Sequence, residues 1–188
     1  MILRRLFTVV ALSALAIAQS TNGAPQRSAI TIRVFKAGVF SGFAHNHVVV
    51  APIARASVNP EGLSAEITVI TKEMKVTDPD VSEKDRAEIQ NTMLGPKVLD
   101  QEKFPEIHFK SSRIQQTSPQ HYRVEGLLEL HGIQHDITLQ VTGDPSHYHG
   151  VTKLKQSEFG IKPISMGGGS IKVKDELELE FDVYGATK

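Results

Sequence analysis

The last stretch of the chain, residues 171–185, reads IKVKDELELEFDVYG and alternates apolar with charged side chains almost without a break. Leu177, Leu179, Phe181 and Val183 share one face of an extended strand, and acidic residues share the other. Strands of this kind form antiparallel sheets with one face toward a core and one toward water. Because a helix cannot satisfy a period of two, this feature constrains the fold more than any other.

The same period recurs in earlier segments of the chain. Three of these segments have predicted inward-facing residues Ile30, Ile32 and Val34; Ala65, Ile67 and Val69; and Ile107 and Phe109. A further stretch is predicted to form a hairpin that turns near His131 and Gly132. The inward-facing residues of its two arms are Tyr122, Val124, Leu128 and Leu130 on the first, and Ile137, Leu139 and Val141 on the second. Strands in such number must close or pack face to face, because open edges aggregate. We expect an all-β fold, an antiparallel barrel of about eight strands whose interior is either filled or holds one small ligand.

One segment breaks the alternation. Ser82 is a suitable N-cap, acidic residues follow it, and Gly95 is a stop signal, so the pattern predicts a helix between them. Ile89 and Met93 lie four residues apart on a narrow apolar stripe, so this helix should rest on the rim of the β structure. A second short turn is expected at residues 96–100.

The first residues differ from the rest. Arg4 and Arg5 precede an apolar run from Leu6 to Ala18, which is the layout of a cleaved signal peptide. The run has 13 residues, fewer than the roughly 20 that cross a bilayer. We expect a signal peptide over residues 1–18, with cleavage as late as residue 24, one domain over residues 28–186, and a periplasmic or secreted mature protein without a stable membrane span.

Charge and composition exclude several functions. Lysine and arginine balance the acidic residues at 21 each, and loss of the two leader arginines leaves a net charge of −2, so no nucleic-acid partner is expected. Cysteine is absent, which excludes disulfides and thiol chemistry. No Gly-x-Ser-x-Gly elbow is present, and the calcium-like start at Asp78 lacks the required glycine and the final glutamate. We therefore expect no enzyme.

His45 and His47 flank Asn46 and would share one face of a strand. Two imidazoles at this spacing can bind Zn²⁺ or Cu²⁺ if another strand supplies a third ligand, from His147 and His149 or from His108, His131 or His135. No carboxylate lies beside the pair in the sequence to orient a ring. The alternatives are a metal-binding protein or small metal-dependent enzyme, and histidines that only hydrogen-bond neighbouring groups.

Three stretches resemble the YceI-like family. The first is residues 83–112, through Asp85, Leu99, Asp100, Phe104, Pro105, Ile107, Phe109 and Ser111; the second is the hairpin, through Gly126, Leu128, Gly132 and Leu139; the third is SEFGI, residues 157–161. The likeness spans Ser28 to Tyr184. The chain departs from the family where Lys36 replaces a histidine that many relatives carry before the glycine matching Gly38, which bears on the polar end of the ligand site.

The resemblance implies a lipocalin-like barrel with a helix over it, and a binding or carrier protein that sequesters a long-chain isoprenoid-like or other amphiphilic lipid. No cofactor other than this lipid is expected, and a homodimer through an exposed barrel edge is compatible with the pattern. His45 and His47 are expected at the polar mouth. The predicted pocket residues are Ile67, Val69, Ile107, Phe109, Leu128, Leu130, Ile137, Leu139, Leu177, Leu179 and Phe181.

Overall fold

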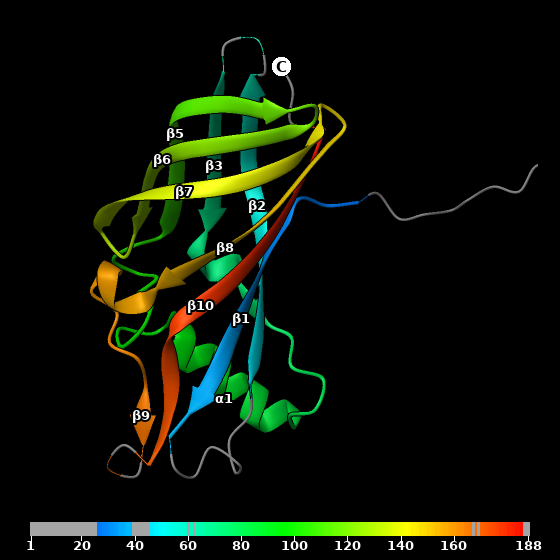
Figure 1. Ribbon diagram of the computed structural model, residues 1–188. Helices are drawn as coiled ribbons and strands as arrows, with labels where there is room; N and C mark the ends of the chain where they lie inside the picture. Colours follow the sequence, from blue (N-terminus) through cyan, green and yellow to red (C-terminus); the bar gives the residue numbers. More distant parts are fainter. Residues whose placement is uncertain are drawn as a thin grey trace, which may run out of the picture.

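The protein is described by a computed structural model covering residues 26–38, 46–59, 61, 63–166, 168 and 170–185. Strands dominate it, as the alternation predicts (Figure 1). In chain order the elements are β1 (Ala29–Ala37), β2 (His47–Asn59), β3 (Ser64–Ile70), the 3₁₀ turn η2 (Thr71–Glu73), β4 (Lys75–Val76), α1 (Glu83–Leu94), β5 (Glu106–Ser118), β6 (His121–Leu130), β7 (Ile133–Asp144), β8 (His147–Lys155), η3 (Gln156–Phe159), β9 (Ser165–Met166) and β10 (Ile171–Tyr184).

The sheet closes into a barrel. Its strands follow the order β1-β10-β8-β7-β6-β5-β3-β2, every pair is antiparallel, and β1 also pairs with β2, which joins the two ends. The short strands β4 and β9 pair with β2 and β10 outside this ring of eight. The predicted antiparallel barrel is therefore confirmed, and closure removes the edges that an open sheet would expose.

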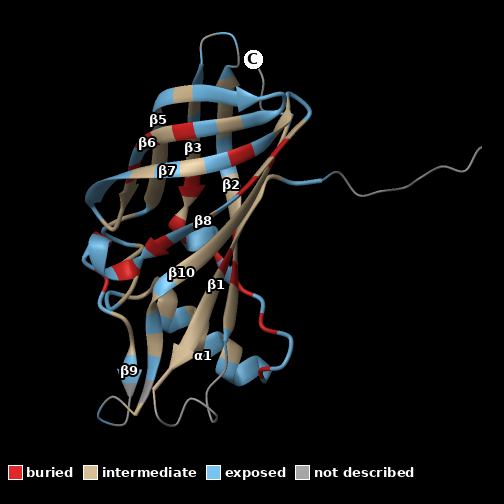
Figure 2. Cartoon of the chain, viewed as in Figure 1, coloured by how far each residue is buried: buried red, intermediate tan, exposed pale blue. Residues whose placement is uncertain are grey.

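The side-chain alternation sorts the barrel into an apolar interior and a polar exterior. Val69, Val124, Leu128, Val141 and Leu154 are buried inside, and Figure 2 shows buried positions on β3, β6, β7 and β8 between exposed ones. The turn between β6 and β7 lies at residues 131 and 132, both with positive φ, as two-residue hairpins require. The predicted hairpin and its inward faces are confirmed.

Helix α1 lies at one end of the barrel, the lower end in Figure 1. The Ser82 hydroxyl accepts a hydrogen bond from the Asp85 N–H, and Gly95 ends the helix, as predicted. Gln90 fastens the helix to β4, because its side chain accepts from the Val76 N–H and donates to the Met74 carbonyl, both at 2.8 Å. The helix therefore covers this end of the interior.

Strand β8 was not among the predicted strands. Its inward positions are Tyr148, Gly150, Thr152 and Leu154, and the glycine and threonine interrupt the apolar period. The strand forms because β7 and β10 supply backbone partners on both sides.

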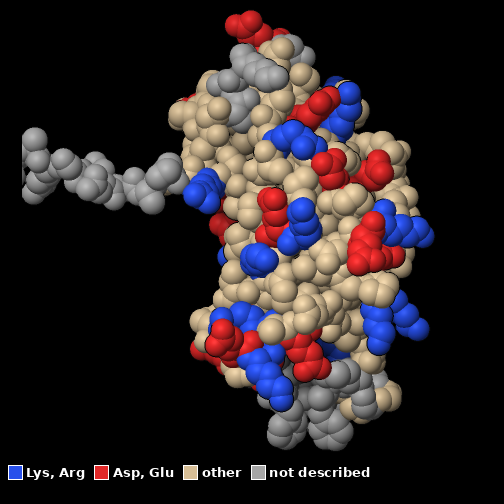
Figure 3. Space-filling model, turned by 180° about the vertical axis from the view of Figure 1, so that it is seen from behind, with Lys and Arg blue, Asp and Glu red and all other residues tan. Residues whose placement is uncertain are grey.

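The outer surface carries charges of both signs. Several charged side chains form cross-strand pairs, such as Lys110 with Glu66 and Lys153 with Glu176. On the face shown in Figure 3, basic and acidic side chains lie interspersed. This face offers no basic stripe of the kind that nucleic acids require. Within the described ranges, no helix is long and apolar enough to cross a membrane.

Candidate functional site: two apolar chambers

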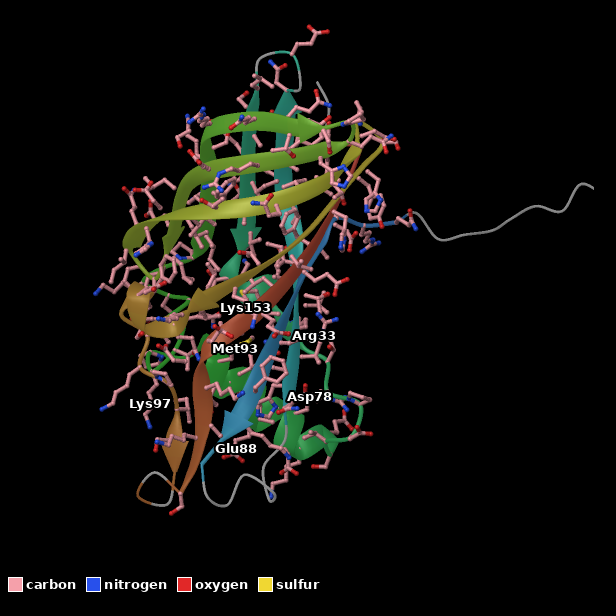
Figure 4. All side chains as sticks on the ribbon, viewed as in Figure 1. Arg33, Asp78, Glu88, Met93, Lys97 and Lys153 are labelled. Atoms are coloured by element: carbon pink, nitrogen blue, oxygen red, sulfur yellow. The ribbon has the colours of Figure 1, made fainter. Side chains whose placement is uncertain are left out.

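Among the residues that the structure describes, two cavities of about 150 Å³ each lie in the barrel interior. The upper chamber lies toward the β2–β3 hairpin, where Val58, Asn59 and Leu63 contribute to its wall. The lower chamber lies toward α1, where Met93, Val98 and Phe159 contribute. Figure 4 labels Met93 on the helix that covers this end of the barrel. Both walls are almost wholly apolar, which suits a hydrocarbon and offers little for a charged substrate.

Four residues line both chambers and form the boundary between them, which we call the waist: Ile30, Leu128, Leu154 and Leu179. They come from β1, β6, β8 and β10. Leu128 and Leu154 are buried here, at 9 % and 8 % exposed. The two chambers therefore adjoin inside one barrel and share these four wall residues.

Every predicted pocket residue lines one or both chambers. Those of the upper chamber are Ile67, Phe109, Leu128, Ile137, Leu139, Leu179 and Phe181. Those of the lower chamber are Val69, Ile107, Leu128, Leu130, Leu177 and Leu179. Contact of these side chains with a ligand belongs to the proposal below.

Two glycines shape the upper chamber. A Cβ at Gly126 would lie 2.6 Å from the Phe109 ring and 2.5 Å from the Lys110 carbonyl. A Cβ at Gly150 would collide with the Phe181 ring in the same way. Each ring therefore lies over a bare backbone on a neighbouring strand, and this close approach leaves the centre of the chamber open.

Two tyrosines lie in the same chamber. Tyr122 and Tyr148 meet edge to face, with ring centroids 6.2 Å apart. Burial, with smaller effects of Tyr122 and Asp144, raises the pKa of Tyr148 above its usual value. The phenol therefore stays neutral over the physiological range, in keeping with an apolar wall.

Several wall residues had no signal in the sequence pattern. Phe159, which is fully buried, and Ile161 come from η3 and the segment after it. Leu99 comes from the turn after α1. Because these segments are not strands, a period of two could not identify their inward side chains. The family resemblance was their indication, through the SEFGI stretch for Phe159 and Ile161 and through residues 83–112 for Leu99.

His47 lies at the start of β2 and lines neither chamber. Its Nδ1 lies 2.6 Å from Asp78 Oδ2, while Asp78 Oδ1 accepts the Val48 N–H at 2.6 Å. Asp78 is nearly fully buried, near the end of the barrel where α1 lies (Figure 4). No carboxylate lies beside this histidine in the sequence, but the fold brings Asp78 to it from 31 residues away.

His45 lies outside the described residues. Within the described part of the chain, His47 belongs to no group of three ligand side chains close enough to hold a metal ion. The geometry of His47 shows a bond to Asp78, and the place of His45 and His47 at a polar mouth or a metal site stays a prediction.

Comparisons with known proteins agree with this architecture. A family model described as the YceI-like domain matches residues 24–184. The structure is similar to that of Burkholderia cenocepacia BcnA, with a TM-score of 0.61 and 18 % identity over 82 % of this chain and 94 % of that one. It is also similar to the Campylobacter jejuni YCEI protein, with a TM-score of 0.50 and 16 % identity over 64 % of this chain and 70 % of that one. A comparison with curated protein sequences gives no match.

Proposed function

This chain belongs to the YceI-like family, and from that premise and the hollow barrel we propose that it binds and carries a long-chain isoprenoid-like lipid or a similar amphiphile. Family and fold support a binding role. The observation that carries the proposal is the pair of adjoining apolar chambers inside one barrel. The lipid chain would extend through both.

The length of the hollow fits a long chain. Inward residues of β10 that line the chambers run from Leu177 to Val183, about 20 Å measured along the strand at ~3.4 Å per residue. The lipid chain would lie along this strand, which is tilted to the barrel axis. An extended hydrocarbon advances ~1.25 Å per bond for a carbon–carbon bond of about 1.5 Å, so about 16 carbons would span it. Each methylene moved from water to such a wall contributes about 0.8 kcal/mol.

The waist favours a thin ligand. We expect a linear chain to pass the four shared wall residues more easily than a broad fused-ring molecule, which would have to displace side chains that belong to a closed sheet. Packed interiors resist such displacement. The polar end of the ligand would lie at the β2–β3 end of the upper chamber, where Asn59 and the exposed Leu63 meet solvent.

We also propose that the protein acts outside the cytoplasm, in the periplasm or after secretion. The support is the arrangement of Arg4, Arg5 and the apolar run before residue 19. Subcellular fractionation with mass measurement of the mature chain tests this. A protein that keeps residues 1–18 and remains in the cytoplasm would contradict it.

Mass spectrometry of organic extracts tests the lipid proposal directly. Untagged protein should release an apolar species in near-stoichiometric amount. Leu179→Trp, which fills the waist, should release less or a shorter species, whereas Val151→Trp on the outer face of β8 should match the wild type. Absence of any such species, together with no binding of added isoprenoid alcohols, would overturn the proposal.

A further inference from the structure

A second cluster of functional groups lies on the outside of the barrel. Strands β8 and β10 are paired so that His149 faces Asp182 and His147 faces Tyr184. Because Tyr148 and Phe181 point inward to the upper chamber, their neighbours in the chain point outward. The outer face of this strand pair therefore collects His147, His149, Glu180 and Asp182, which we call the outer cluster.

The outer cluster is compact. One ligand atom each from His149, Glu180 and Asp182 lie within 4.8 Å of one another. His149 Nδ1 is 3.1 Å from Asp182 Oδ1, and His147 Nε2 is 2.7 Å from the same oxygen. Two ligands of a tetrahedral zinc ion lie ~3.4 Å apart when the bonds are ~2.1 Å. His149 and Asp182 are held by a hydrogen bond at 3.1 Å, so a shared metal ion would replace this bond after a shift of only a few tenths of an ångström.

The setting favours a positioned site over mobile surface charges. The side chains of His147, His149 and Asp182 are 40 %, 38 % and 35 % exposed, and they stand on two strands paired over nine positions. The His147 ring also stacks on Tyr184 with centroids 4.3 Å apart. Sites on paired strands hold their geometry better than sites on loops.

We propose that the outer cluster binds one divalent transition-metal ion, with Zn²⁺ as the best match. His149, Glu180 and Asp182 are the ligands, and His147 hydrogen-bonds Asp182 and orients it, as outer partners of metal ligands do. One imidazole and two carboxylates with a remaining open position is a ligand set that zinc accepts. The imidazole nitrogen of His149 suits zinc better than calcium or magnesium, which are hard cations that prefer oxygen ligands.

Arg33 opposes binding in the free protein. Its guanidinium donates to Glu180 Oε2 at 2.8 Å from the adjacent strand β1, and Figure 4 labels it there. A metal ion must share Glu180 with this cation, which repels it. Replacement of Arg33 by glutamine should therefore tighten metal binding, a change that a purely structural role of the cluster would not produce.

Isothermal titration with ZnCl₂, using the full chain without an affinity tag, tests the proposal. The wild type should bind one ion per chain. His149→Ala and Asp182→Asn should weaken binding at least about tenfold, since even outer partners of a ligand contribute 10- to 100-fold, and Arg33→Gln should strengthen it. The matched control is His108→Ala on β5, where the histidine has a single carboxylate partner, Glu106, at 3.0 Å. It should leave the affinity unchanged.

Cobalt supplies a second readout, because Co²⁺ in a four-coordinate site absorbs visible light much more strongly than the hydrated ion. The wild type and Arg33→Gln should develop this absorption, and Asp182→Asn should not. Circular dichroism confirms that each variant is folded. Equal Zn²⁺ affinity in the wild type and Asp182→Asn, or an equal loss in His108→Ala, would overturn the proposal. It is independent of the lipid proposal, because the cluster lies on the opposite face of the sheet from the chambers.

Discussion

The waist between the chambers can be tested by placing one large side chain in it. Leu179 lines both chambers, and the chain contains no tryptophan. Leu179→Trp therefore narrows the waist and also introduces a single fluorophore at the place where the lipid chain should pass. Val151→Trp is the matched control, because Val151 lies on the neighbouring strand β8, points outward and is 58 % exposed.

The expected effect follows from chain length. If the ligand extends through both chambers, lengthening a linear alkanol from about 10 to about 14 carbons adds ~3 kcal/mol, or roughly 200-fold in affinity, at ~0.8 kcal/mol per methylene. In Leu179→Trp the affinity should level off near about 8 carbons, the share of one chamber in the ~20 Å hollow. Overfilling the waist should lower the free energy of unfolding by about 1–3 kcal/mol.

Two measurements test this prediction. Competition against a fluorescent fatty-acid probe gives the dissociation constant for each chain length, and tryptophan emission reports contact at the waist. Emission from Leu179→Trp should shift on addition of an alkanol, and emission from Val151→Trp should not. If Leu179→Trp binds the longer alkanols as tightly as the wild type and its emission does not change, the ligand does not pass the waist and the serial-chamber reasoning is wrong.

Three further predictions concern the walls and their supports. Phe159→Ala should lower the free energy of unfolding in urea by about 3–5 kcal/mol, because Phe159 is 0 % exposed; a loss below ~1 kcal/mol would contradict the packing described. Asp78→Ala should cost about 2–3 kcal/mol, because it leaves the Val48 N–H without its charged acceptor, whereas Asp80→Ala, an exposed neighbour, should be nearly neutral in the same titration. Hydrogen bonds from the Ser157 hydroxyl and N–H lower the pKa of Asp175 below its ordinary 3.8. Its stabilising effect is therefore complete above pH 3.8 and is lost as the pH falls through the lower folded value; Asp175→Asn should flatten this part of the stability–pH curve, and an unchanged curve would argue against the bond.

Most of the strand positions could be predicted from residue order, because the period of two is a local property. Leu177, Leu179 and Phe181 point inward in any sheet that buries their face. The helix from Glu83 to Leu94 could also be predicted from local signals, because the Ser82 hydroxyl cap and the terminal Gly95 each act within one helical turn. Strand β8 failed the same test because Gly150 and Thr152 stand at inward positions, and its conformation is imposed by the neighbouring strands.

Side-chain contacts between residues far apart in the sequence could not be predicted. Asp78 reaches His47 from 31 residues away, and the outer cluster joins His149 to Asp182 across 33 residues. Alternation states which face a side chain occupies, but a shift of one residue in strand pairing would separate each of these pairs. These contacts therefore depend on the register in which β2 pairs with β4 and β8 pairs with β10.

The presence of the two chambers also depends on the tertiary structure and could not be predicted from the sequence. The positions of the inward side chains and the apolar character of the wall could be predicted from the sequence, because the alternation that determines them is local. Whether those side chains meet in a solid core or leave two chambers depends on the barrel's circumference, on Gly126 and Gly150 admitting two phenylalanine rings, and on four residues converging at the waist. The volume left inside the barrel depends on side chains from strands that are distant in the sequence. The closed barrel therefore determines whether cavities remain.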